Sequence, residues 1–285
     1  MDERGLGKRL QAARQKAGLT QQQLCQKANL SFSTLTKIER GAIKSPSIFT
    51  IQAIAGAIGT SLDELVGVPV RPARQLSRTK SGASFIYFDM NGCLVHFSQA
   101  AFTRIAADTG KPADLIEAAF WQYNDEACRG QLSMADFNAA LAKKIGVESL
   151  DWQKYYLEAV EPVHEMREIV EWAAKHYKVG LFTNTAPGLV SALRSSGQLP
   201  DIAYDAIIDS SEVGVIKPES RIYEIAAERA DCSPEEIILI DDTRPNLMAA
   251  AKMGWGVMWF DEVQTEKSAA AVRQILEPDT AKTEN

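Results

Sequence analysis

The sequence predicts two folding units: an all-α domain, followed by an α/β domain built on a parallel sheet. Residues 1–84 hold 13 Lys and Arg against 5 Asp and Glu, whereas residues 85–285 hold 18 against 32. A chain of 285 residues with a formal net charge of −6 therefore divides into a basic part and an acidic part, which suggests units with different partners. Apolar residues recur at helical spacing up to residue 67, and from residue 84 short apolar runs alternate with helix-like stretches.

Composition excludes several classes of protein. Hydrophobic residues make up 46% of the chain and charged residues 24%, as in ordinary globular proteins. We find no apolar run of about 18 residues and no secretory signal at the start, so we expect no membrane association. The four cysteines, Cys25, Cys93, Cys128 and Cys232, are too widely spaced for a zinc site or a disulfide framework. A reducing cytoplasm is the expected location.

Residues 1–67 form the predicted all-α domain, with five short helices. Their N-caps are expected at Ser31, Ser47 and Ser61. Residues 68–83 form the expected linker, since residues 68–82 hold two prolines, four basic residues and no acidic residue. This segment is either a solvated tether or an arm that also contacts nucleic acid.

The segment 19–41 predicts two short helices, the second lying across the first. The exposed face of the second helix would hold Phe32, Ser33, Thr36 and Lys37. Short polar and basic side chains near a helix N-terminus can reach base edges in a DNA major groove. Gln21, at the start of the first helix, is positioned to hold a phosphate.

Residues 4–67 resemble the lambda-repressor-like, Cro/CI-type helix-turn-helix family through the Leu19-Thr20-Gln21 turn and the Ile38-Glu39-Arg40-Gly41 ending. The resemblance implies binding to double-stranded DNA as a homodimer, with the DNA-facing side chains Gln21, Ser33, Thr36 and Lys37. Phe32 departs from the polar residues frequent at its position, and either contacts a thymine methyl group or is partly buried. The alternative is a helical domain that binds protein.

From residue 84 to 278 the chain predicts a Rossmann-like parallel sheet with helices on both faces. The expected strands are Phe85–Phe88, Val179–Phe182, Ile207–Ile208, Ile237–Ile240 and Gly256–Phe260. Residues 98–178 hold several amphipathic helices and no convincing strand, which predicts an inserted helical cap. Aromatic residues in this insertion either form its core or line a substrate pocket: Trp121, Tyr123, Trp152, Tyr155 and Tyr156.

Polar side chains follow the predicted strands at their carboxyl ends, which is where a parallel sheet binds ligands. Asp89 follows the first strand, Thr183 ends another, and Asp241 and Asp242 follow a third. Lys217 precedes a predicted helix. Three carboxylates are suited to Mg²⁺, while a hydroxyl and a lysine suit phosphoryl oxygens, so a carboxylate is positioned to attack phosphorus.

Residues 84–262 resemble the haloacid dehalogenase superfamily, whose four motifs occur here in order. The resemblance implies that Asp89 is the nucleophile and a metal ligand. The backbone carbonyl of Asn91 would be a further ligand, and Asp241 with Asp242 would hold Mg²⁺. The resemblance also implies a helical cap over the site.

By the same resemblance Thr183 and Asn184 form the phosphate pocket, and Lys217 neutralises charge during catalysis. Asn91 departs from the family, because most phosphatases of the superfamily have there an Asp that donates and accepts the proton. An amide does neither, and loss of such help slows turnover by roughly 10²–10⁴-fold.

Three interpretations stay open for the acidic unit: an active phosphatase, a slow or inactive enzyme that senses a phosphorylated ligand, and a dehalogenase. The whole chain is interpreted as a DNA-binding transcriptional regulator whose Mg²⁺-dependent second domain binds a small phosphorylated metabolite. Hydrolysis through an aspartyl-phosphate is left open by Asn91. The alternative is primarily a phosphomonoester hydrolase with an accessory DNA-binding domain.

Overall fold

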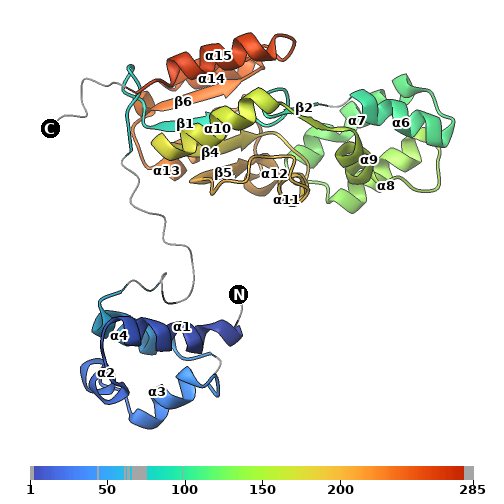
Figure 1. Ribbon diagram of the computed structural model, residues 1–285. Helices are drawn as coiled ribbons and strands as arrows, with labels where there is room; N and C mark the ends of the chain where they lie inside the picture. The colour runs from blue at the N-terminus through green and yellow to red at the C-terminus, as the bar shows by residue number, and fades with distance from the viewer. Residues whose placement is uncertain are drawn as a thin grey trace. The chain divides into compact units, whose positions relative to one another are not determined.

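The chain forms two compact units, Met1–Arg74 and Gln75–Asn285 (Figure 1). The computed structural model describes residues 3–43, 45–60, 62, 65, 76–97 and 99–278. Within these ranges, no helix combines the length and the apolar composition needed to cross a membrane.

The first unit is helical, as expected. Its helices are α1 (Glu3–Lys16), α2 (Gln21–Ala28), α3 (Phe32–Glu39) and α4 (Ile48–Ile58). Ser31 and Ser47 are N-caps, because their side chains accept hydrogen bonds from the backbone N–H groups of α3 and α4. Ser61, most of the fifth expected helix and residues 68–75 of the expected linker lie outside the described residues.

The core of this unit is made by one apolar face from each helix. Leu10 of α1, Leu24 of α2, Leu35 of α3 and Ile54 of α4 are all fully buried. The helical spacing of the apolar residues therefore predicted the core correctly, since residues three and four apart share one face of a helix.

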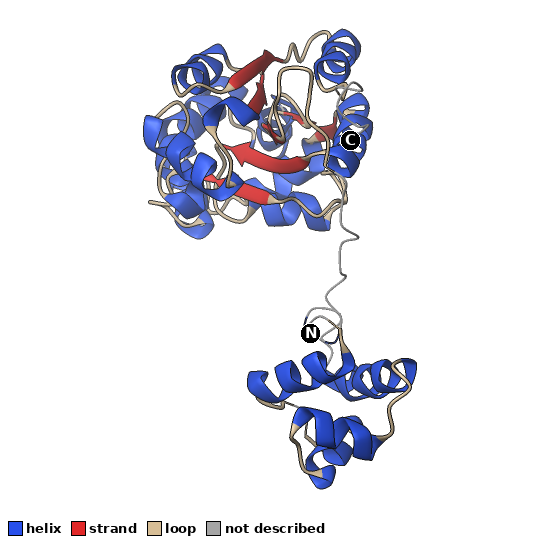
Figure 2. Cartoon of the chain, turned by 90° about the vertical axis from the view of Figure 1, so that its left-hand side faces the viewer, coloured by secondary structure: helices blue, strands red, loops and turns tan. Residues whose placement is uncertain are grey.

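The second unit is an α/β domain on a five-stranded parallel sheet of order β5-β4-β1-β6-β7, enclosed by helices (Figure 2). All five expected strands are confirmed. Their bounds are β1 (Phe85–Phe88), β4 (Lys178–Thr183), β5 (Ala206–Asp209), β6 (Ile237–Asp241) and β7 (Gly256–Trp259).

Alternate residues of β1 enter different cores, because successive side chains of a strand point to opposite faces. Ile86 and Phe88 pack in the core beneath α10 (His164–His176), α11 (Leu189–Ser195) and α15 (Thr265–Ile275). Phe85 and Tyr87 pack in the core beneath α13 (Ser220–Ala230) and α14 (Arg244–Lys252). The short helix α12 (Ser210–Val213) follows β5, and a 3-10 turn (Pro234–Glu236) precedes β6.

A helical insertion leaves the sheet after β1 and gathers at one end of the domain (Figure 1). Its helices are α6 (Gln99–Thr109), α7 (Ala113–Cys128), α8 (Met134–Ile145) and α9 (Trp152–Ala159). The short strands β2 (Val95–His96) and β3 (Glu161–Pro162) pair antiparallel where the chain enters and leaves it. α10 falls inside the range 98–178 but packs against β4 and α15, so it belongs to the sheet layers.

Candidate functional site

Three carboxylates meet at the carboxyl ends of β1 and β6. Asp89 follows β1, Asp241 ends β6, and the two strands are neighbours in register. Asp242 is the next residue, and one oxygen of each carboxylate lies within 4.8 Å of the others. Parallel strands thus bring together side chains that are some 150 residues apart in sequence, as the strand-end pattern predicted.

Lys217 lies among these carboxylates and is 3% exposed. Its Nζ lies 2.9 Å from Asp89 Oδ1 and 2.6 Å from Asp241 Oδ2. Burial lowers the pKa of Lys217, but the attraction of the two carboxylates outweighs it and raises the pKa above its usual value. The lysine therefore stays charged and compensates two buried negative charges, which would otherwise be strongly unfavourable.

Two carboxyl groups of the cluster, Asp89 and Asp242, have raised pKa values. Burial raises the pKa of Asp89 to about 7, although the charge of Lys217 opposes it. Burial and the charge of Asp241 raise the pKa of Asp242 to about 6. A site that holds this much negative charge favours a cation, since a bound cation stabilises the ionised carboxylates.

The two polar residues at the end of β4 differ in what they contact. Asn184 Nδ2 donates to the carbonyl of Lys217 at 2.9 Å, and its Oδ1 accepts from the Lys217 backbone N–H at 2.8 Å. Thr183 is fully buried, and its hydroxyl has no hydrogen-bond partner among the described residues. Asn184 thus fixes the main chain at Lys217, whereas Thr183 keeps an unused hydroxyl.

Two further residues complete the cluster through contacts that the sequence did not predict, although Gly92 is expected from the sequence to permit the tight turn after Asp89. Asn246, at the start of α14, donates from Nδ2 to both oxygens of Asp241, at 3.1 and 3.2 Å. Gly92 lies so close to Asp242 that a Cβ there would be 2.4 Å from Asp242 Oδ2. Both follow a motif carboxylate within a few residues, and that closeness in sequence is the signal that could have identified them.

Two polar contacts join the helical insertion to the sheet domain. Tyr156 of α9 donates its hydroxyl hydrogen to Asn91 Oδ1 at 2.5 Å. Arg129, at the end of α7, pairs with Glu219, whose carboxylate lies 2.5 Å from its Nη2. The insertion is therefore attached directly over the carboxylate cluster, in the position expected of a cap.

A cavity of about 550 Å³ lies between the carboxylates and the insertion. The lining residues from the sheet domain include the predicted site residues Asp89, Asn91, Asn184, Lys217 and Asp242. Further lining residues come from the insertion and the segments after β6 and β7: Phe97, Phe120, Trp121, Asn124, Asp125, Thr243, Pro245, Asn246 and Glu262. This volume suits a small ligand.

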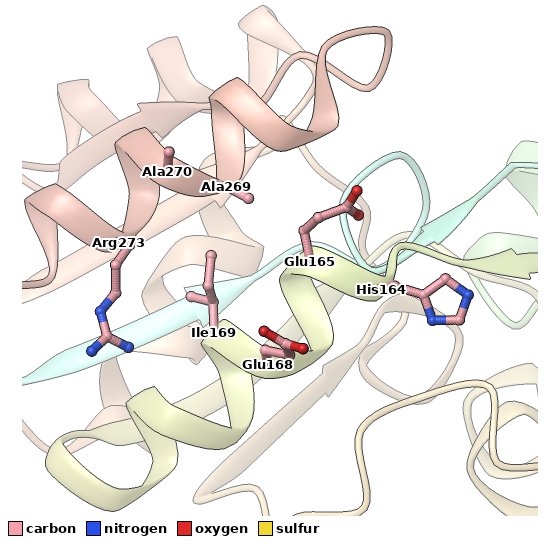
Figure 3. Close-up of a pocket in the computed structure, with 7 residues that line it drawn as sticks. All are labelled: His164, Glu165, Glu168, Ile169, Ala269, Ala270 and Arg273. Carbon is pink, nitrogen blue, oxygen red and sulfur yellow. The ribbon is translucent and has the colours of Figure 1, made fainter.

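A separate hollow of about 420 Å³ lies between α10 and α15 (Figure 3). Glu165 and Glu168 come from α10, and Arg273 comes from α15. It shares no residue with the cavity at Asp89, so the chemistry of the carboxylate cluster does not extend to it.

In the first unit, α3 presents most of the predicted DNA-facing side chains to solvent. Ser33 and Lys37 are exposed, and Phe32 is 51% exposed, so Phe32 is a surface residue. Thr36 is half-buried, and its hydroxyl donates to the Phe32 carbonyl at 2.8 Å. The face is polar and basic around one aromatic ring.

Gln21 has a partner inside the unit that the sequence did not indicate. Its Nε2 donates to Glu39 Oε2 at 2.7 Å, and Glu39 also pairs with Arg14 through an Nε–Oε1 distance of 2.7 Å. Arg14 and Glu39 are buried, so they join α1 to α3 across the core. Gln21 thus stands against a fixed carboxylate at the start of α2.

Comparison with known proteins gives the same division of the chain. Residues 10–65 match a family described as Helix-turn-helix, and a 62-residue stretch is 47% identical to the immunity repressor protein of Bacillus phage phi105. A 72-residue stretch is 39% identical to bifunctional epoxide hydrolase 2 of Rattus norvegicus. These alignments cover 22% and 25% of this chain, but only 42% of the repressor and 12% of the rat enzyme.

Solved structures share the fold of the second unit. A HAD-like family hydrolase from Porphyromonas gingivalis superposes with a TM-score of 0.56 at 22% identity, over 67% of this chain and 97% of that one. A haloacid dehalogenase family enzyme from Bacteroides thetaiotaomicron, solved with magnesium and inorganic phosphate, gives 0.54 at 17% identity, over 63% and 94%. Residues 85–254, more than half of the chain, match the haloacid dehalogenase-like hydrolase family. The chain therefore belongs to the haloacid dehalogenase-like hydrolases and carries a helix-turn-helix DNA-binding domain ahead of its hydrolase domain.

Proposed function

We propose that this protein is a DNA-binding transcriptional regulator whose hydrolase domain binds Mg²⁺ and a small phosphorylated metabolite. The observation that carries the proposal is the group formed by Asp89, Asp241, Asp242 and Lys217 beneath a cavity of ligand size. Carboxylates together with one buried cation match the charges of a metal ion and a phosphoryl group.

The residues present fit Mg²⁺. Asp89, Asp241 and Asp242 offer hard oxygen ligands within 4.8 Å of one another, and the backbone carbonyl of Asn91 is the proposed fourth. When bound, the ion would offset the charge of the carboxylates and of the phosphoryl oxygens. The relative from Bacteroides thetaiotaomicron, solved with magnesium and inorganic phosphate, supports this choice of cation.

Each of the remaining site residues has its own role in the proposed reaction. An Asp89 oxygen attacks phosphorus and forms an aspartyl-phosphate, while the bond from phosphorus to the ester oxygen breaks and that oxygen leaves with the electron pair. Lys217 Nζ holds the Asp89 carboxylate and binds phosphoryl oxygens. The Thr183 hydroxyl, which has no partner among the described residues, supplies a further hydrogen bond to phosphate. Asn184 acts through Lys217, whose main chain it holds on both sides.

A haloacid substrate is the second candidate, because a 106-residue stretch is 27% identical to an (S)-2-haloacid dehalogenase of Pseudomonas fluorescens. A haloacid also carries a carboxylate, which needs a cation. Among the described residues that line the cavity, Lys217 is the only cation, and it already faces two carboxylates. Either substrate therefore depends on a further cation, and the three carboxylates that fit Mg²⁺ favour the phosphoester, because it carries the larger negative charge for that ion to offset.

The regulator is preferred to an enzyme with an accessory DNA-binding domain on two grounds. Asn91 has no proton to exchange, so hydrolysis lacks general acid and base help. The DNA-binding domain is 47% identical to a phage repressor over a 62-residue stretch. Double-stranded DNA is thus the proposed partner, bound by a homodimer.

Phosphatase turnover with Mg²⁺ in wild-type protein, Asp89→Asn and Asn91→Asp tests the proposal. We expect slow wild-type turnover, none in Asp89→Asn, and a rate increase of roughly 10²–10⁴-fold in Asn91→Asp. Fast wild-type turnover that Asn91→Asp does not raise would favour the enzyme instead. Failure of the wild-type protein to bind Mg²⁺ and inorganic phosphate by calorimetry would contradict both.

A further inference from the structure

The wall of the cavity that the insertion contributes is aromatic. Phe97, Phe120 and Trp121 line it, with the Trp121 ring 5.8 Å from Phe97 and 5.0 Å from Phe120 between centroids. Trp121 is nevertheless 52% exposed, so the core does not use all of its ring. Such a surface favours an aromatic ligand, because offset or edge-to-face ring contacts add to the burial of apolar area.

The charged residues that line the cavity beside this aromatic wall are negative. Asp125 comes from α7 and Glu262 from the segment after β7, and both line the cavity. Lys217 is the single cation among the described lining residues, and it lies at the carboxylate end. A second anionic group on the ligand would therefore meet repulsion with no compensating partner.

Position 91 restricts the group that leaves phosphorus. The Asn91 amide has no proton to transfer, and its Oδ1 already accepts the Tyr156 hydroxyl. The Tyr156 hydroxyl already uses its hydrogen in that bond, so it does not supply a proton to the leaving oxygen either. The leaving oxygen must therefore depart as an anion. A phenol loses its proton near a pKa of about 10, against about 15.7 for water, so a phenolate is a far better leaving group than an alkoxide.

We propose that the site selects phosphate monoesters of phenols that carry no further anionic group. This inference depends on the proposed phosphoester function. An Asp89 oxygen bonds to phosphorus, and the bond from phosphorus to the phenol oxygen breaks. Its electron pair stays on the phenolate, which takes a proton from solvent. Water then attacks phosphorus, which releases inorganic phosphate and restores the Asp89 carboxylate. Since residue 91 cannot activate that water, the aspartyl-phosphate accumulates.

The test compares phenyl phosphate with benzyl phosphate on the full-length protein with Mg²⁺, because both offer a ring but only one leaves as a phenolate. We expect kcat/KM to be at least about 10²-fold higher for phenyl phosphate, because this constant reports the transfer to Asp89 and not the later hydrolysis that both esters share. Phenyl phosphate should also give a burst of phenol, and intact mass after acid quenching should show one phosphoryl group on the chain. Asn91→Asp should reduce the difference in kcat/KM between the two esters and abolish the burst of phenol. Asp89→Asn should abolish the phosphorylated chain.

Equal values of kcat/KM for the two esters would overturn the inference and leave the proposed hydrolysis standing. Absence of phenol release and of phosphorylated chain with every ester would overturn both.

The aromatic wall and the charge are tested separately. Trp121→Ala should raise KM for phenyl phosphate by up to about tenfold, whereas Trp121→Phe keeps a ring and should change it less. Inhibition by inorganic phosphate should be the same in both variants. In the wild-type protein, 4-carboxyphenyl phosphate should show a higher KM than 4-methylphenyl phosphate. An unchanged KM in Trp121→Ala, or no penalty for the added carboxylate, would overturn the proposed selection.

Discussion

Because Gly92 has no side chain, Asp242 can approach the proposed metal site. Its φ of +84° is a left-handed conformation that residues with a Cβ rarely adopt. Asp242 Oδ2 occupies the space in which a Cβ would lie, at a distance of 2.4 Å. Glycine at position 92 thus allows both the left-handed turn after Asp89 and the close approach of the Asp242 carboxylate.

Gly92→Ala should therefore displace Asp242 and weaken Mg²⁺ binding by at least about tenfold, since one of three carboxylate ligands moves. Isothermal titration with Mg²⁺ measures the change. Gly82→Ala is the matched control: its φ is +93°, so the backbone penalty is similar, but a Cβ there meets nothing within 4 Å. Equal losses of affinity in the two variants would show that strain, and not the carboxylate, is responsible.

The direction of an amide side chain is the feature that sequence reasoning predicts least well. The position of Asn184 at a strand end was predictable, but its partner, the main chain of Lys217, lies 33 residues away. Gln21 likewise bonds Glu39, 18 residues away. Such partners depend on how distant segments pack, whereas Asp89 and Asp241 were predictable because buried parallel strands deliver their last residues to one edge.

At the scale of elements, the strands were easier to predict than the limits of the insertion. Each buried strand is a short run of apolar residues, and this pattern is local. α10 has the same amphipathic pattern as α6 to α9, so periodicity alone cannot show that it packs on β4 and α15. The pairing of β2 with β3, two residues each, is also too short to be read from sequence.

The ends of α7 and α9 attach the insertion to the sheet domain. Besides the pair between Arg129 and Glu219, Gly130 lies against the backbone of Ser211, where a Cβ would come within 2.2 Å of the carbonyl oxygen.

Arg129→Ala should raise the rate of amide hydrogen exchange in α7 by about fivefold at most, because a partly exposed ion pair contributes little to stability. Arg104→Ala, which removes a 3.9 Å pair with Glu158 inside the insertion, is the control. Exchange that rises equally in both variants would contradict a specific attachment at Arg129.

At the scale of the whole molecule, the division of charge follows the division into domains. Residues 1–84 hold 13 basic residues against 5 acidic ones, and this part includes the DNA-binding domain. Part of the acidic excess in the remaining chain is accounted for by Asp89, Asp241 and Asp242, which face a common point instead of solvent. The division of charge therefore agrees with the two proposed partners, a polyanion for one domain and a cation for the other.

The last prediction concerns the DNA-binding domain in the full chain. Lys37 is exposed on α3, so Lys37→Ala should weaken binding to double-stranded DNA. If Lys37 contacts a phosphate, the slope of log affinity against log salt should fall by about 1 for each bound chain, because one fewer counterion is released. For a homodimer on two half-sites, the slope should then fall by about 2. Lys143→Ala, on α8 of the other domain, makes the same change of charge and should leave the slope unchanged. A slope that Lys37→Ala does not alter, with unaltered affinity, would mean that α3 does not face DNA.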